Sequence, residues 1–114
     1  MIPLAVPDLT GNEASYLARC IEDTYISSVG SFVDKFEHDL GRCAGAKFVS
    51  ATTSGSAAIY LALKACGAGP GDLVITPSFT FIATANAVSL CGANVWLVDI
   101  EAESLTMNPW QLDQ

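Results

Sequence analysis

The sequence contains few basic residues and no apolar run long enough to cross a bilayer. Twelve acidic residues stand against five basic ones, which gives a net charge of −7 at pH 7. The basic residues are scattered and form no stripe, so the sequence indicates no nucleic-acid partner. Because no apolar stretch approaches about 18 residues, it also indicates no membrane span.

Two further features are absent: the basic flank of a signal peptide at the N-terminus, and any C-x-x-C pair. The first absence predicts a cytoplasmic protein. The cysteines stand far apart, and each falls near the C-terminal end of an apolar helical stretch. We therefore expect buried, reduced thiols in place of a disulfide or a metal site. These cysteines are Cys20, Cys43, Cys66 and Cys91.

The sequence is rich in apolar residues. Hydrophobic residues make up 51% of the 114 residues and charged residues only 15%. This composition excludes a disordered chain, and the length allows at most one domain. A chain this short and this apolar has more apolar surface than it can bury by itself, which indicates part of something larger.

Residues 1–46 have the pattern of a helical segment. Thr10 and Glu13 have the spacing of a capping box, and a helix with one apolar face follows. A second helix is predicted to begin at Ser31 and to end at Gly45. We expect this second helix to bury its face of Val33, Phe36 and Leu40.

From residue 47 the sequence pattern changes, and residues 47–100 predict a βαβαβ unit with parallel strands. A short apolar strand at 47–50 leads through a Ser-Gly turn into an Ala- and Leu-rich helix that ends near residue 66. A second strand at 73–76, a helix from Thr80 to about residue 91 and a third strand at 94–98 follow. Strands that alternate with helices and Gly-rich joints are typical of a parallel α/β sheet.

Residues 101–114 indicate the start of another element. Asn108 followed by Pro109 is a strong helix start, yet about one turn of chain follows, fewer than the roughly 12 residues that a stable helix needs. We therefore interpret residues 1–114 as a single incomplete domain, the N-terminal part of something longer.

The turn at 51–58, Ala-Thr-Thr-Ser-Gly-Ser-Ala-Ala, carries the chemistry. It directs the first N–H groups of a helix and several hydroxyls toward one point, which is favourable for an anion such as phosphate. The spacing is neither that of a P-loop nor that of a dinucleotide-binding G-x-G-x-x-G turn. An ordinary strand-to-helix joint is an equally good interpretation of the turn by itself.

Taken in order, several segments closely resemble the start of the DegT/DnrJ/EryC1/StrS family. These segments are Ile2-Pro3-Leu4-Ala5, Ser28-Val29-Gly30 with Phe36-Glu37, Thr53 to Ala58, Gly69 to Ala87, and Val98-Asp99. The family comprises pyridoxal-phosphate (PLP) aminotransferases of fold type I that act on nucleotide-linked keto sugars. The opening of this chain looks most like the branch that aminates 4-keto UDP-N-acetyl sugars on the way to bacterial nonulosonic acids. The resemblance implies that this chain is part of the large domain of such an enzyme.

The resemblance also implies site residues. Gly55, Ser56 and Ala57 would hold the PLP phosphate, Phe81 would stack on the pyridine ring, and Thr84 would face the same pocket. The loop at Ser28, Val29 and Gly30 would lie beside the sugar nucleotide. By position alone, Phe81 is also compatible with a core aromatic, and the loop with a plain turn between helices.

The lysine that holds the cofactor covalently in the family has no match here, because Lys35, Lys47 and Lys64 occupy other positions. The resemblance therefore predicts no catalytic residue in this chain and no activity of the chain alone. Two alternatives stay open: a non-enzymatic, self-associating interaction module, and another doubly wound enzyme with Ser56 on a nucleotide phosphate.

The sequence also predicts that the chain associates with copies of itself. In the family's sheet, later strands separate the strand at 48–51 from the other two strands of this segment. Either that first strand moves beside the strand at 73–76 in a three-stranded sheet, or copies of the chain complete each other's sheets. We favour self-association, as a dimer or larger.

Overall fold

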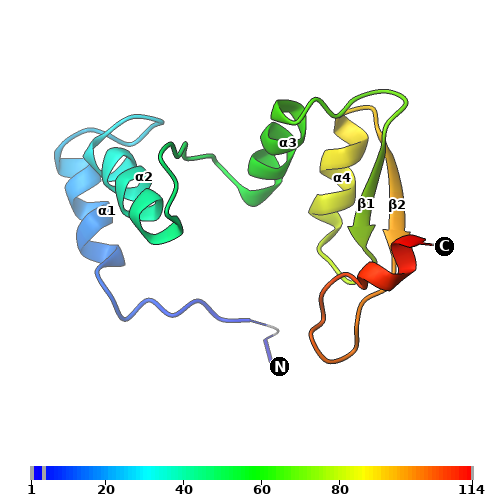
Figure 1. Cartoon of the computed structure of the whole chain (residues 1–114). Coiled ribbons are helices and arrows are strands. Elements are labelled where there is room, and N and C mark those ends of the chain that lie inside the picture. Colours follow the sequence, from blue (N-terminus) through cyan, green and yellow to red (C-terminus); the bar gives the residue numbers. More distant parts are fainter. Residues whose placement is uncertain (1, 4, 114) are drawn as a thin grey trace. The chain divides into compact units, whose positions relative to one another are not determined.

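The structure, a computed structural model, describes residues 2–3 and 5–113. The chain divides into two compact units, Met1–Ala51 and Thr52–Gln114 (Figure 1). In the described part of the chain, no helix is long and apolar enough to cross a membrane.

The first unit contains two helices, α1 (Glu13–Glu22) and α2 (Ser31–Ala44). The predicted end of α2 is confirmed, since Gly45 takes the left-handed conformation with φ 66°. The predicted capping box is wrong. Asn12 precedes α1, and the Thr10 hydroxyl donates to Asp8 Oδ1 at 2.8 Å, so it does not cap the helix.

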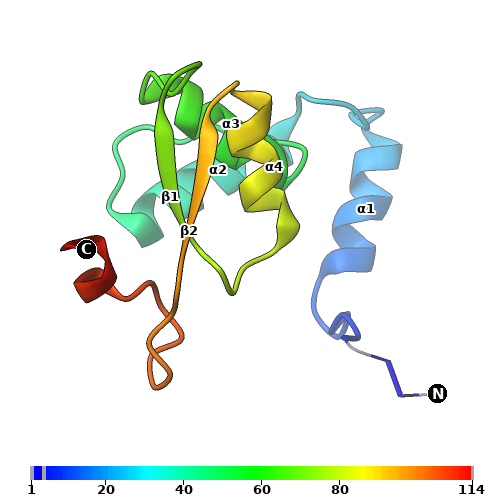
Figure 2. The same cartoon turned by 90° about the vertical axis from the view of Figure 1, so that its right-hand side faces the viewer.

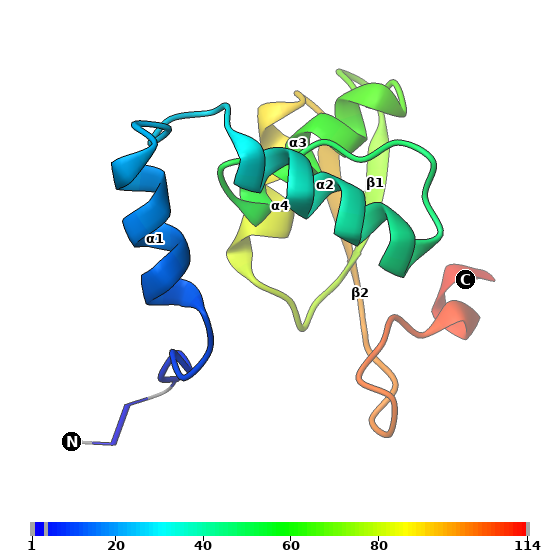
Figure 3. The ribbon, with the colours of Figure 1, turned by 90° about the vertical axis from the view of Figure 1, so that its left-hand side faces the viewer.

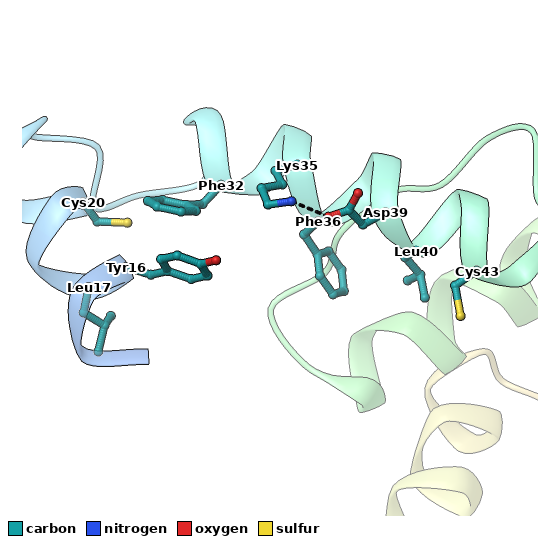
Figure 4. Close-up of a pocket in the computed structure, with 9 residues that line it drawn as sticks. All are labelled: Tyr16, Leu17, Cys20, Phe32, Lys35, Phe36, Asp39, Leu40 and Cys43. Atoms are coloured by element: carbon teal, nitrogen blue, oxygen red, sulfur yellow. Dashed lines mark hydrogen bonds and ion pairs between the residues drawn. The ribbon is translucent and has the colours of Figure 1, made fainter. Parts of the chain in front are cut away.

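The predicted burial of the apolar face of α2 is also wrong for two residues. Phe36 and Leu40 are exposed, and they line an open apolar groove of about 590 Å³ that α1 and α2 share (Figure 4). The helices meet at one end of the groove, where the Tyr16 and Phe32 ring centroids are 4.8 Å apart. Toward Leu40, no further element of this unit covers the face.

An ion pair lies at the rim of this groove. Lys35 Nζ and Asp39 Oδ2 are 2.5 Å apart, one helical turn from each other on α2 (Figure 4). This hydrogen bond raises the pKa of Lys35 and lowers the pKa of Asp39. Both side chains are about half exposed, so the pair contributes little to the stability of α2.

The first predicted strand does not form. Residues 46–52 have no regular secondary structure, and Phe48 is 83% exposed. A strand exists only through hydrogen bonds to a neighbour, and the described chain provides none at this position. The apolar pattern of residues 47–50 was therefore not sufficient to specify a strand.

The second unit contains a parallel strand pair with helices. Strands β1 and β2 lie side by side and run in the same direction (Figure 2), paired from Leu73 with Asn94 to Pro77 with Val98. Among the described residues the sheet has these two strands only, so the predicted βαβαβ unit lacks its first strand, and that strand has not moved beside β1. The elements are α3 (Gly55–Ala65), β1 (Leu73–Pro77), α4 (Ile82–Leu90), β2 (Asn94–Val98) and the 3-10 helix η1 (Pro109–Asp113).

The last segment of the second unit folds back on the end of β2. Ile100 pairs with Met107 in an isolated antiparallel bridge. The predicted helix start is confirmed, because Asn108 Oδ1 accepts a hydrogen bond from the Trp110 N–H at 3.1 Å and η1 follows.

The core of the second unit is small and lies where α4 packs on the strand pair. Val88 is the largest fully buried side chain. The predicted burial of the cysteines holds for Cys91 and is wrong for Cys43 and Cys66, which are exposed. All four thiols are free. The other buried residues are Thr76, Ala87, Ala93 and Val98.

One buried polar atom in this core predicts a stabilising substitution. Thr76 is 3% exposed, and its Oγ1 has no hydrogen-bond partner among the described residues. Because an unsatisfied buried hydroxyl costs about 1–3 kcal/mol, Thr76→Val should raise the free energy of unfolding by about 1 kcal/mol or more. Urea titration measures this. Thr106→Val, at an exposed hydroxyl that contacts Ser104, is the control and should not stabilise. A loss of stability in Thr76→Val would contradict the prediction.

Candidate functional site

The N-terminus of α3 is built by a serine cap. Ser54 is extended, with φ −163° and ψ 160°, and its Oγ accepts a hydrogen bond from the Ala57 N–H at 3.2 Å. The Ser54 carbonyl accepts the first helical bond from Ala58 and a second bond from the Thr52 hydroxyl at 3.0 Å. The sequence therefore starts the helix at one defined residue, as serine before a helix usually does.

This cap leaves two N–H groups available at the helix end. Within residues 2–3 and 5–113, no acceptor is recorded for the amides of Gly55 and Ser56. A Cβ added at Gly55 would meet no atom within 4 Å, so the approach to the turn is open. The Ala57 amide differs, because a ligand would have to compete with Ser54 Oγ for it.

The turn suits an anion electrostatically. Free N–H groups and the positive end of the helix dipole stabilise a negative charge there. Residues 51–58 include no acidic residue and contribute four hydroxyl side chains. These observations favour a phosphate group, although the whole chain is acidic.

A second segment, 78–84, connects β1 to α4. Phe81 precedes the helix and is 87% exposed, so it is not the core aromatic that its position alone would allow. Thr84 is half-buried, and its Oγ1 lies 3.0 Å from Oγ1 of Thr80. The sequence places Thr80 at the start of this helix, but α4 begins at Ile82 and no side chain caps it.

These two segments lie at the same end of the second unit. α3 and α4 pack together and run in the same direction, so that both N-termini and the carboxyl ends of β1 and β2 are at the lower end in Figure 1. Ligands of parallel α/β sheets bind outside the carboxyl ends of the strands. Gly55, Ser56, Ala57, Phe81 and Thr84 thus lie at the end of the unit that also holds the carboxyl ends of β1 and β2.

The loop Ser28-Val29-Gly30 belongs to the first unit and begins α2. Gly30 has φ 147° and ψ 165°, a conformation open almost only to glycine, and a Cβ there would lie 3.0 Å from Cβ of Tyr25. Val29 is exposed, and the loop lines a small pocket of about 170 Å³. The loop is therefore a shaped feature, beyond a plain connection between helices.

Two of the three lysines make contacts within the first unit. Lys35 pairs with Asp39, and Lys47 lies 5.2 Å from the centroid of the Phe48 ring. Lys64, the one lysine of residues 52–114, is in the last turn of α3. At 1.5 Å per residue its backbone lies about 14 Å along the helix axis from Gly55.

Sequence reasoning missed two contacts made by residues of the segments 51–58 and 78–84. The Thr80–Thr84 hydroxyl pair has only a weak signal, the i, i+4 spacing of two threonines. The contact of Glu37 with residue 51 has no signal in the spacing, because it joins residues 14 apart.

Comparison with known proteins agrees with this geometry. Residues 7–114 match the DegT/DnrJ/EryC1/StrS aminotransferase family. The GDP-perosamine synthase of Caulobacter vibrioides is 44% identical over 112 residues, which cover 98% of this chain and 30% of that protein. The chain thus spans about three tenths of the length of the curated relatives it matches.

Solved structures show the same fold. A DegT DnrJ EryC1 StrS aminotransferase from Brucella abortus superposes with a TM-score of 0.80 at 36% identity, over 88% of this chain and 26% of that one. Spr1654 of Streptococcus pneumoniae, solved in its PLP form, gives a TM-score of 0.86 at 29% identity, over 99% and 29%. The predicted α/β fold, shared with PLP-dependent aminotransferases of fold type I, is confirmed.

Proposed function

Because the chain belongs to the DegT/DnrJ/EryC1/StrS aminotransferase family, we propose that it is the cofactor-phosphate part of a sugar aminotransferase. The complete enzyme would use PLP to move an amino group from glutamate to a nucleotide-linked 4-keto sugar. The name of the Caulobacter relative supports a GDP-linked sugar as the acceptor, in place of the UDP-linked sugar that the resemblance in the sequence implied.

The observation that carries this proposal is the open N-terminus of α3. The amides of Gly55 and Ser56, the Ser56 hydroxyl and the room above Gly55 fit a phosphate group in donor type and in space. Ala57 would add a third amide when Ser54 Oγ releases it. Exposed Phe81 offers an aromatic face to a flat ring, and Thr84 lies one turn further along α4.

In this proposal, bound PLP supplies an electron-withdrawing ring, and this chain's residues bind and orient it. Gly55, Ser56 and Ala57 hold the phosphate end, while Phe81 excludes water from one ring face. Ser28, Val29 and Gly30 would contact the sugar nucleotide, and the fixed conformation of Gly30 suits a loop that must keep its shape. The chain carries no residue for the proton transfers, so it should be inactive alone.

Reduction with borohydride in the presence of PLP tests this division of labour. Lys64 lies about 14 Å along α3 from Gly55, and none of the three lysines matches the position of the family's cofactor lysine, so no single lysine should be labelled stoichiometrically. Peptide mapping of the reduced chain measures the labelling. One stoichiometric pyridoxyl-lysine would show that the chain holds the cofactor covalently by itself.

Ser56→Ala should weaken PLP binding by about 1 kcal/mol, the net contribution of one hydrogen bond. The substitution removes the hydroxyl and keeps the amide, and alanine is compatible with the helix. Absorbance titration with PLP measures the change. Ser89→Ala, which removes an exposed hydroxyl near the C-terminal end of α4, is the control. Equal affinities for the Ser56→Ala variant and the unmodified chain would place the anion elsewhere.

Two alternatives have specific tests. A self-associating interaction module is favoured by the exposed apolar residues of both units, and the oligomeric state addresses it. A nucleotide-phosphate enzyme with Ser56 on the phosphate would bind a nucleotide in preference to PLP, which competition between the two ligands distinguishes.

A further inference from the structure

Thr52 makes a contact that the proposed function does not use. Its side chain is exposed, and its hydroxyl donates a hydrogen bond to the Ser54 carbonyl oxygen at 3.0 Å. The same oxygen accepts the first bond of α3 from the Ala58 N–H at 3.1 Å. All three residues belong to the second unit, in which α3 packs beside α4 (Figure 3). Two donors therefore hold one carbonyl at the start of the helix.

The Ser54 carbonyl and the Gly55 amide belong to the same peptide group. This group is planar and trans, so the Gly55 N–H points opposite to the Ser54 C=O. The carbonyl points along α3 toward Ala58, and the amide therefore points out of the N-terminus of the helix. Whatever fixes the direction of the carbonyl also fixes the direction of the amide.

The bond from Ala58 is a weak restraint by itself, because the terminal hydrogen bonds of a helix fray. Thr52 adds a restraint from outside the helix, and the Ser54 hydroxyl adds another by accepting from the Ala57 N–H. Residues 52–54 have no strand or helix to restrict them otherwise. A turn that is ordered before the ligand arrives loses less conformational entropy when the ligand binds.

We infer that Thr52 is a positioning residue, whose hydroxyl fixes the Ser54–Gly55 peptide and thereby directs the Gly55 amide toward a phosphate group. A threonine hydroxyl has one proton to donate, and here Ser54 receives it, so Thr52 acts through the backbone and not by contact with the ligand. The inference rests on the phosphate site proposed above. It uses only residues 52–58, which lie within the second unit.

The first experiment uses NMR on the full 114-residue chain without ligand. Thr52→Val keeps the branched shape and removes the hydroxyl, so it should shift the Gly55 amide resonance and accelerate hydrogen exchange at Ala58 about twofold or more. Thr52→Ser keeps the hydroxyl and should restore both signals. Ser89→Ala, at an exposed hydroxyl near the C-terminal end of α4, is the control and should change neither. Unchanged signals in Thr52→Val would overturn the inference.

The second experiment measures affinity for PLP and for pyridoxal, which lacks the phosphate. Thr52→Val should weaken PLP binding about two- to tenfold, the effect of one hydrogen bond, and leave pyridoxal binding unchanged. Thr52→Ser should bind PLP within about twofold of the unmodified chain. Thr52→Ala also removes the hydroxyl and should reproduce the loss if Thr52→Val fails to fold. Urea titration of each variant checks the fold, and a weaker PLP affinity that serine does not restore would overturn the role of the hydroxyl.

The outcomes separate this inference from the proposed function. Unchanged PLP affinity in Thr52→Val, alongside a loss in Ser56→Ala, overturns the positioning role and keeps the phosphate site. Weaker PLP binding with unchanged signals in the ligand-free chain means that the Thr52 hydroxyl contacts the phosphate directly, which also overturns the positioning role. No PLP binding by the unmodified chain overturns the phosphate site, and the role of Thr52 with it. Changed ligand-free signals and a loss for PLP, both restored by serine, support both proposals.

Discussion

Replacing Val88 with aspartate should unfold the second unit. Val88 is 1% exposed and is the largest side chain that the described core buries completely. An unpaired carboxylate in this place costs several kilocalories per mole, since α4 and the strands offer it no cation. At 0.05–0.15 kcal/mol per residue, a unit of this size is stable by only about 3–9 kcal/mol.

Leu90→Asp is the matched control for this substitution. It introduces the same residue two positions away on α4, where the leucine is exposed, and it should leave the fold intact. Circular dichroism and the dispersion of the amide resonances of residues 73–98 measure the outcome. A dispersed spectrum for Val88→Asp would show that this core does not hold the unit together.

The strands show how much of the fold a local sequence pattern can predict. The apolar runs at 73–76 and 94–98, bounded by Gly and Pro, predicted β1 and β2 almost to the residue, because each finds its partner within the chain. The run at 47–50 has the same local signal, but its amide hydrogen bonds need a neighbour that the described chain does not contain. A strand is a property of two segments, and one segment's pattern cannot specify it.

The amphipathic pattern of α2 was misleading for the same reason. Phe36 and Leu40 lie on one face, as a buried helix requires, but burial also needs an opposing surface. In contrast, the serine cap of α3 depends on residues 54–58 alone, and its geometry follows from the sequence. The contact of Glu37 with Ala51 depends on how the chain returns after α2, which no local pattern reveals.

The exposed surface of the chain is larger than its size explains. It amounts to 9192 Å², whereas two separate compact units of this total mass would expose about 7,200 Å². The excess of about 2,000 Å² per chain is in the range that obligate interfaces bury.

The strand pair carries part of this excess. Consecutive strand residues point to opposite faces of a sheet, yet Trp96 is 39% exposed and its neighbour Leu97 is 59% exposed. Neither face of β2 is therefore fully covered. Parallel sheets are almost always covered on both faces, and a two-stranded sheet also leaves both outer edges open.

We therefore expect the chain to self-associate at micromolar concentration, with the sheet in the contact. Leu97→Lys places a charge on the uncovered face and should raise the dissociation constant at least about tenfold, equivalent to about 1.4 kcal/mol. Ser89→Lys adds the same charge at an exposed polar position of α4 and should leave association nearly unchanged. Sedimentation velocity over a range of concentrations measures both. A monodisperse monomer for the unmodified chain would refute self-association, and equal effects of the two lysines would exclude the sheet as the contact surface, because only a contact through β2 distinguishes position 97 from position 89.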